Sequence, residues 1–258
     1  MAQLDALVRY LDGELRTADV PDYDAALNGL QLANSGEVTR VAAAVDFSAG
    51  AVDGAVRAEA HLLIVHHGMF WRGAHPLIGR AYDRLRAAID NDLAVYSSHI
   101  PLDLHPTLGN NVLLAAELEL ASSGSFGRWR GGVEIGVLGT CDLPTKVLVD
   151  RVRAFSAKFN TVAVSTPFDN QRRTRRWAII SGAGASQETL AEAHERGVDT
   201  LIVGEGPHHT AVDAMETGLV VVYGGHYATE TLGVRATADR LAEHFGVSST
   251  FVNLPTGL

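Results

Sequence analysis

The sequence predicts an α/β protein built from two related lobes that face each other across a shared cleft. Short aliphatic runs alternate with segments whose apolar residues recur at helical spacing, which is typical of α/β units. The two halves also repeat one order: strand, helix, strand with a His-His pair after it, helix, strand with a single His after it. We expect residues 1–123 to form the first lobe and residues 124–258 the second, with the C-terminal helix free to pack back on the first. A chance likeness of ordinary α/β units is the alternative.

The first half begins with an amphipathic segment. Leu4, Leu7 and Leu11 fall at helical spacing, so a helix is expected over residues 3–16. Asp46 or Ser48 could cap a later helix. The other elements expected in this half are strands over 30–33, 38–45, 62–65 and 93–96 and helices over 49–60, 77–90 and 110–120.

The second half begins after Ser122-Ser123-Gly124-Ser125, a short, polar stretch that reads as a flexible lobe boundary. The run from Arg172 to Arg176 favours a solvated loop over a phosphate site. The elements expected here are strands over 133–138, 161–164, 177–180, 201–203, 219–223 and 249–252 and helices over 145–158, 186–196, 210–217 and 227–245.

Composition narrows the class of protein. The net charge of -9 over 258 residues disfavours bulk electrostatic binding to nucleic acid, although it leaves a local contact open. Cys141 is the only cysteine, so an intrachain disulfide and a cysteine-based zinc site are excluded and a reducing cytoplasm is the default location. The first residues lack signal-peptide features, and apolar runs stay well short of the roughly 20 residues that span a bilayer. We expect a soluble protein with no membrane partner.

The stretch from Leu62 to Trp71 carries the most information. Four apolar residues read as a buried strand, His66 and His67 stand at its end, and Gly68 lets the backbone turn. Neighbouring residues of a regular strand point to opposite faces, so two adjacent histidines serve one pocket only where the strand ends. In α/β proteins the carboxyl ends of strands are where ligands bind. A pair of exposed loop histidines is the alternative.

Histidines and carboxylates together predict a metal site. Six of the 11 histidines follow predicted strands at corresponding places: 66, 67, 99, 208, 209 and 226. Neutral imidazole binds zinc, copper, iron and nickel, and carboxylates extend the range to manganese and magnesium. Asp103 lies four residues after His99, and Glu230 lies four after His226, so that pair shares one helix face. The conjunction of these motifs at strand ends predicts a metal-containing cleft.

The motifs His66-His67-Gly68, Ser98-His99-Ile100-Pro101-Leu102-Asp103, Gly109-Asn110-Asn111 and Gly225-His226-Tyr227-Ala228-Thr229-Glu230 closely resemble the Nif-three-like family, whose members are often labelled GTP cyclohydrolase I type 2 homologues. The resemblance runs from Asn28 to Gly233. It implies a dinuclear metal centre in a two-lobed α/β protein that assembles as a toroidal homohexamer. The metal ligands it implies are His66, His67, Asp103, His226 and Glu230. Two divalent ions per chain are expected, from among zinc, iron, manganese and nickel.

Several nearby residues have two interpretations. His99 could orient a ligand or a water, and His209, with His208, could reach the cleft from the second lobe; both His99 and His209 are candidate catalytic residues. Surface histidines are the alternative for the 208–209 pair. The turn Ser181-Gly182-Ala183-Gly184 favours tight packing of helix against strand over a phosphate cradle, since it lacks a full dinucleotide fingerprint.

Two functions from different classes follow from these residues. The first is a metal-dependent hydrolase acting on a nucleotide or phosphoester, of the GTP cyclohydrolase I type 2 kind by resemblance. The second is a non-catalytic metal-binding assembly or regulatory protein. Histidine and carboxylate ligands leave open coordination positions plausible, which favours the hydrolase. The sequence carries no nucleotide-recognition signature, so the substrate stays open.

Overall fold

The computed structural model describes residues 1–71, 73 and 75–258, and these form two compact units. Unit 1 comprises residues 1–105 and 233–254, and unit 2 comprises residues 106–232 and 255–258. The division differs from the boundary expected near residue 123. The stretch expected as a linker is part of strand β7 (Ser122–Arg128), whose backbone pairs with β8 and whose Phe126 is fully buried. Backbone pairing and one apolar anchor therefore order a stretch whose small polar side chains indicated flexibility.

Unit 1 is built on a five-stranded sheet with the order β13-β4-β5-β6-β2. Its central strands run parallel, and β2 is antiparallel at one edge. The bounds are Gly29–Leu32 for β2, Arg40–Asp46 for β4, Leu62–His67 for β5, Ala94–Ser97 for β6 and Ser248–Phe251 for β13. A separate two-stranded ribbon pairs β1 (Ala2–Gln3) with β3 (Glu37–Val38).

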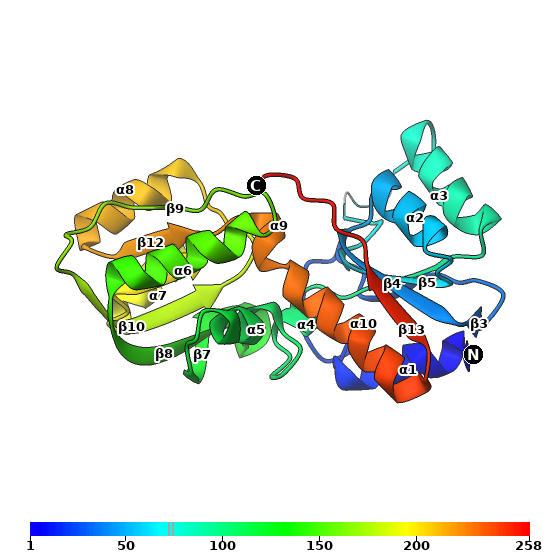
Figure 1. Cartoon of the computed structure of the whole chain (residues 1–258), viewed down its shortest axis with the longest axis horizontal. Coiled ribbons are helices and arrows are strands. Elements are labelled where there is room, and N and C mark those ends of the chain that lie inside the picture. The colour runs from blue at the N-terminus through cyan, green and yellow to red at the C-terminus, as the bar shows by residue number, and fades with distance from the viewer. Residues whose placement is uncertain (72, 74) are drawn as a thin grey trace. The chain divides into compact units, whose positions relative to one another are not determined.

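Helices cover both faces of this sheet (Figure 1). α2 (Ala49–Arg57) and α3 (Arg80–Asp90) lie on one face, and α1 (Leu4–Glu14) and α10 (Thr231–Phe245) lie on the other. Alternate strand residues pack against α2 and α3 in one core cluster that includes Ala42, Ala44, Leu63, Val65 and Val95. This two-residue period is what a strand imposes, and burial on both faces explains why the strands read as continuous apolar runs. Ser48 caps α2 by accepting the Ala51 N–H.

Unit 2 is built on a six-stranded sheet with the order β7-β8-β10-β11-β12-β9. β10 (Arg173–Ile180), β11 (Thr200–Val203) and β12 (Val220–Tyr223) run parallel, while β8 (Glu134–Pro144) and β9 (Val164–Ser165) flank them in the antiparallel sense. The run of arginines was expected in a loop, but from Arg173 onward it forms the first part of strand β10. The guanidinium of Arg172 donates to the carbonyls of Asp199 and Gly218, and that of Arg173 to Asp142.

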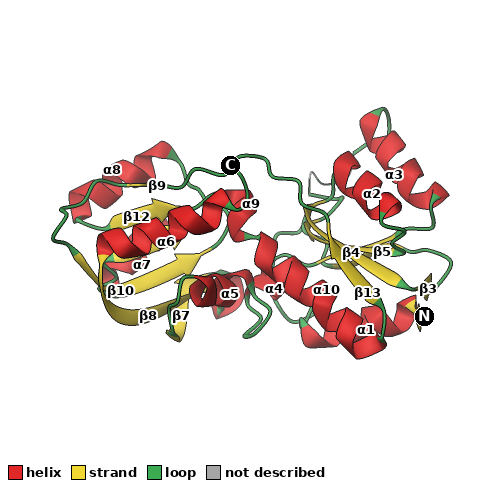
Figure 2. Ribbon diagram, in the orientation of Figure 1, coloured by secondary structure: helices red, strands yellow, loops and turns green. Residues whose placement is uncertain are grey.

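The helices of unit 2 form a layer on each face of its sheet (Figure 2). α7 (Gln187–Glu195) and α8 (His208–Thr217) share a core cluster with alternate residues of β10, β11 and β12. α5 (Asn110–Glu117), α6 (Thr145–Ala157) and α9 (His226–Thr229) pack together with the sheet in the other layer. A short 3-10 turn, Arg130–Gly132, joins β7 to β8.

The two units share one topology. The order β4-β5-β6-β2 in unit 1 corresponds to β10-β11-β12-β9 in unit 2, with three parallel strands and one antiparallel edge strand in each. In both, the edge strand precedes the parallel strands in the chain. The predicted α/β fold with related halves is therefore confirmed at the level of strand order.

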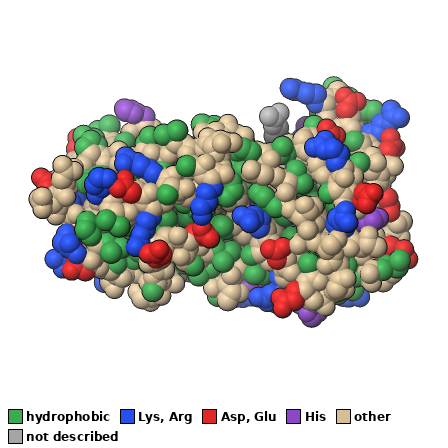
Figure 3. All heavy atoms as spheres, in the orientation of Figure 1, with side chains coloured by type: hydrophobic (Ala, Val, Ile, Leu, Met, Phe, Trp, Pro, Cys, Tyr) green, Lys and Arg blue, Asp and Glu red, His purple; other side chains and the backbone are tan. Residues whose placement is uncertain are grey.

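Charged side chains are mixed over the visible surface. On the face shown in Figure 3, Lys and Arg alternate with Asp and Glu and form no continuous basic patch. None of the helices in the described part of the chain is long and apolar enough to cross a membrane.

Candidate metal centre

The carboxyl edge of the unit 1 sheet gathers the predicted residues of the first half. Asp46 is the last residue of β4, and it lies beside His67, the last residue of β5, in the parallel ladder. His99 follows β6 by two residues. Because parallel strands end at the same edge, these side chains from three separate stretches of sequence meet there.

The rings of His66, His67 and His99 converge at this edge. The centroid of the His66 ring lies 4.9 Å from that of His67 and 4.9 Å from that of His99, and the His67 and His99 centroids are 5.7 Å apart. One nitrogen from each of the three rings lies within 4.8 Å of the others. The end of β5 thus lets two adjacent histidines turn toward one place, and His99 joins them as a potential ligand.

Each of these three rings is held through its Nδ1 atom. His67 Nδ1 lies 2.8 Å from Asp46 Oδ1, His99 Nδ1 lies 2.8 Å from Asp22 Oδ1, and His66 Nδ1 lies 2.9 Å from the Ser98 carbonyl oxygen. Carboxylates and carbonyls only accept, so Nδ1 is the donor in each pair and the neutral ring carries its lone pair on Nε2. This is the tautomer and orientation that metal-binding histidines take in proteins.

Asp22 also fixes the loop that carries His99. Its carboxylate accepts the Ile100 N–H and the Asn28 side-chain amide, while Asn28 Oδ1 accepts the His99 N–H. Burial raises the pKa of Asp22, but the hydrogen bond and charge of His99 outweigh it, so the pKa is lowered from its usual value. An ionised carboxylate therefore stands behind the His99 ring.

Asp103 reaches the same place from a short helix. This helix is α4 (Ile100–Asp103), with Pro101 in its first turn, where a missing N–H costs nothing. Asp103 Oδ2 lies 3.7 Å from His66 Nε2. Two ligands of one ion, each about 2.1 Å from it, lie at most about 4.2 Å apart, so this pair fits a shared ion.

The second set of predicted ligands lies at the carboxyl edge of the unit 2 sheet. His226 Nε2 is 3.1 Å from Glu230 Oε2, and His226 Nδ1 is 2.7 Å from Glu205 Oε1. The expected single helix is broken here: α9 ends at Thr229, Glu230 is its C-cap, and α10 begins at Thr231. Burial lowers the pKa of His226, but the hydrogen bonds and charges of Glu230 and Glu205 outweigh it and raise the pKa to about 9.

The turn after β10 supports Glu230. A Cβ on Gly182 would lie 2.0 Å from Glu230 Oε1, and the φ of +60° at this residue also favours glycine. The Gly182 N–H donates to Thr229 Oγ1, and Asn111 Oδ1 accepts the Ser181 N–H. This agrees with a tight packing turn, and it gives the Asn111 motif a role in placing the ligand.

The structure differs from the expectation for His208 and His209. Both are exposed in the first turn of α8 rather than at the end of β11. The strand end that corresponds to His66 and His67 carries Gly204 and Glu205 instead. Strand order is thus repeated between the halves, but the histidine pairs are not equivalent.

Sequence reasoning also missed the side chains that hold the histidines. The sequence pattern offers Asp46 only as a helix cap, and no motif contains Asp22 or Glu205. The available signal was position, since Asp46 ends β4 and Glu205 follows β11 by two residues.

Both units offer side chains that can act as metal ligands. Unit 1 offers imidazoles and the Asp103 carboxylate, and unit 2 offers an imidazole and the Glu230 carboxylate, all at buried or half-buried positions. Nitrogen and oxygen donors of this kind suit zinc, iron, manganese or nickel. The residues present therefore form groups that could hold a metal ion.

Comparisons with known proteins give the family of the chain. The sequence model of the Duf34/NIF3 (NGG1p interacting factor 3) family matches residues 2–256. The GTP cyclohydrolase 1 type 2 homolog of Deinococcus radiodurans is 40% identical over 98% of this chain and 94% of its own length. Two solved structures are also similar: protein ybgI, of unknown function, with a TM-score of 0.87 and 32% identity over 99% of this chain and 100% of that one, and TTHA1606 from Thermus thermophilus, with 0.82 and 34% over the same shares. The chain belongs to the Duf34/NIF3 family.

Proposed function

We propose that this protein binds two divalent metal ions through His66, His67, Asp103, His226 and Glu230 and is a hydrolase of nucleotides or phosphoesters. The observation that carries the proposal is the hydrogen bonding of the histidines. His66, His67, His99 and His226 each place Nδ1 against an acceptor, and three of the four acceptors are carboxylates. Side chains held in this way are oriented to present Nε2 to an ion.

The chain's own residues would divide the work. The named ligands hold the ions, and the acceptors behind them fix ring orientation. His99, anchored by Asp22 beside His66 and His67, is the group placed to move a proton, whereas exposed His209 is the weaker candidate. When bound, a pair of ions can lower the pKa of water and neutralise an oxyanion.

Metal analysis tests the ligand set. Glu230 has two carboxylate oxygens and can bridge two ions, which a neutral imidazole cannot do. Glu230→Gln keeps the size and removes the charge, so we expect it to lose metal from both positions, while Asp103→Asn loses it mainly from one. Two ions fully retained per chain in Glu230→Gln would refute the bridging role.

Turnover separates the two functional classes. Metal-reconstituted protein is offered a panel of nucleotides and phosphoesters, with His66→Ala and Glu230→Gln as inactive controls. Hydrolysis that both substitutions abolish supports the enzyme. Full metal occupancy without turnover of any compound favours the non-catalytic assembly.

We also propose that the protein assembles as a homohexameric ring in the cytoplasm. The support is the resemblance of its motifs to the Nif-three-like family, together with a single cysteine that needs no oxidising compartment.

A further inference from the structure

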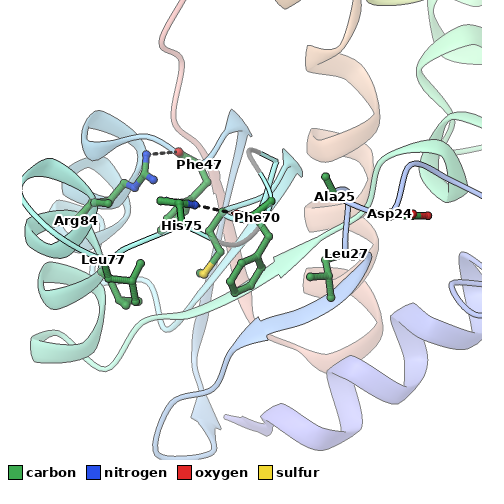
Figure 4. A pocket seen from close by; sticks show the side chains of 12 residues that line it. Asp24, Ala25, Leu27, Phe47, Phe70, His75, Leu77 and Arg84 are labelled. Atoms are coloured by element: carbon green, nitrogen blue, oxygen red, sulfur yellow. Dashed lines mark hydrogen bonds between the residues drawn. The ribbon is translucent and has the colours of Figure 1, made fainter.

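A cavity of about 550 Å³ opens in unit 1 (Figure 4), and its lining includes Phe47, the residue after Asp46, and Met69, two residues after His67. Its lining comes from three places: the residues after the ends of β4 and β5, one side of α3, and the segment before β2. Small-molecule sites in proteins commonly measure about 300–1,000 Å³ and are lined mainly by apolar and aromatic side chains. The cavity falls within this range.

Hydrogen bonds fix the walls and tie them to the site. The Phe47 N–H donates to the His67 carbonyl oxygen at 2.9 Å. Gln31 accepts the Met69 N–H at 2.7 Å and donates to the Leu27 carbonyl at 2.9 Å, so it joins two of the walls. A Cβ on Gly68 would lie 2.3 Å from Gln31 Nε2, which shows how closely the histidine turn is packed on this clamp. The cavity is therefore built into the frame that holds His67.

The lining suits an apolar ring that carries a negatively charged substituent. Phe47, Met69, Phe70 and Leu85 present apolar surface, and Figure 4 shows Phe70 beside Leu27. Arg84 supplies the positive charge: its guanidinium lies 4.6 Å from the Phe47 ring centroid and donates to the Phe47 carbonyl at 3.0 Å. The carboxylate of Asp24 points away from the other labelled side chains in Figure 4. Few hydrogen-bonding groups face the space, which disfavours a sugar or a peptide backbone.

We propose that this cavity binds the apolar ring of an aryl phosphoester or similar ring-bearing anion. The inference deepens the proposed function and rests on it only for the reaction, because it names the part of the substrate that lies beside the reacting bond. Phe47 and Met69 each lie within two residues of a side chain of the centre, so a ring held here would set its anionic substituent near the histidines.

Binding to metal-free protein tests the cavity without the reaction. We would titrate 1-naphthyl phosphate and 2-glycerol phosphate by calorimetry, since the two share a phosphate and differ in the ring. Ala81→Trp fills the cavity from α3, and Ile89→Trp places the same side chain on an exposed position of that helix as a control. We expect 1-naphthyl phosphate alone to bind, at least about tenfold more weakly in Ala81→Trp, and as in the native protein in Ile89→Trp.

A separate variant tests the role of Arg84. Arg84→Met should weaken 1-naphthyl phosphate by about tenfold and leave 1-naphthol, which lacks the charge, within about twofold. Thermal unfolding of each variant verifies that it is folded.

Equal binding of the two phosphates would overturn the inference, and so would unchanged binding of 1-naphthyl phosphate in Ala81→Trp. A change in the mass of the assembly in Ala81→Trp would also overturn it, because the cavity would then belong to an interface with a second copy of the chain. Ring-dependent binding without hydrolysis by the metal-loaded protein would instead refute only the hydrolase. Hydrolysis that is indifferent to the ring would refute only the cavity.

Discussion

Among single residues, the side chains that accept a hydrogen bond from a histidine Nδ1 orient the imidazole rings, a role that the sequence did not indicate. A carboxylate hydrogen-bonded to Nδ1 fixes the ring and increases the basicity of Nε2. Asp46 does this for His67, Asp22 for His99 and Glu205 for His226. These residues are expected to affect metal binding without touching the ion.

Asp46→Asn tests this role at His67. The amide keeps the size but weakens the acceptor and lets the ring turn, so metal affinity should fall about 10–100-fold while the fold is retained. Competition with a chelating dye measures the affinity. Asp53→Asn, exposed on α2, is the matched control and should bind metal like the native protein. Unchanged affinity in Asp46→Asn would contradict the orienting role.

Gly182→Ala tests the support of Glu230. The added methyl group would occupy space that Glu230 Oε1 now fills, and we expect the carboxylate to move and metal affinity to fall about tenfold or more. Gly197→Ala introduces an alanine at a similar positive φ, +65°, with no heavy atom within 4 Å of its Cβ, and thus reproduces only the backbone strain. Both variants should lose about 1 kcal/mol of stability from strain. Equal metal binding in the two would show that the Gly182 contact does not matter.

At the scale of elements, side-chain hydrogen bonds link connecting segments that are distant in the sequence. Asp92, in the turn between α3 and β6, accepts the N–H and the hydroxyl of Ser35, which lies between β2 and β3. The hydrogen bond from the Ser35 hydroxyl is the largest influence on the pKa of Asp92 and lowers it below 3.8.

The hydrogen bonds between Asp92 and Ser35 predict that the free energy of unfolding depends on pH. A carboxyl whose pKa is lower in the folded state contributes stability above its unfolded pKa, and that contribution is lost as the pH falls through the folded value. Asp92→Asn should therefore cost about 0.5 kcal/mol at pH 7, small because solvent screens the group, and progressively less as the pH falls, with little cost left at about pH 2. Urea unfolding at both pH values measures this. An equal loss at both would assign the effect to packing instead.

Elements with a clear apolar pattern could be predicted from the sequence, whereas strands that begin with polar or charged residues could not. The strands β4, β5, β11 and β12 are apolar on both faces and read directly from the sequence. By contrast, β7 begins with Ser-Ser-Gly-Ser, and in β10 the guanidinium of Arg173 pairs with Asp142 while that of Arg176 donates to the Arg196 carbonyl. These strands are stabilised by pairing with other strands, β8 in both cases, so the side chains within each strand do not reveal them.

Across the whole molecule, the repeated topology explains why the place of the candidate site could be predicted from the sequence and its supporting residues could not. In each unit the carboxyl edge of three parallel strands carries the proposed ligands, and this edge could be located from the order of strands. The residue at each strand end has to be read individually: β5 ends in histidines, whereas β11 is followed by Gly204 and Glu205. Similar folds thus place different chemistry at equivalent points.

The surface of unit 2 has a feature that suits assembly. β9 stands at the end of the strand order, and Val162 and Val164 beside it are 85% and 55% exposed. Apolar side chains at a sheet edge invite pairing with another chain unless something covers them. We expect this edge to be covered in the proposed hexamer.

The mass in solution tests the assembly and the edge together. Six chains of 27.5 kDa give about 165 kDa, and light scattering at low micromolar concentration should find this mass for the native protein. Lysine at both Val162 and Val164 should reduce it, because each substitution would place a charge in an apolar interface at a cost of several kcal/mol. Val212→Lys, on the exposed side of α8, is the control and should keep the full mass. A native mass that stays near 27.5 kDa would contradict the hexamer, and a full mass in the double lysine variant would place the interface away from β9.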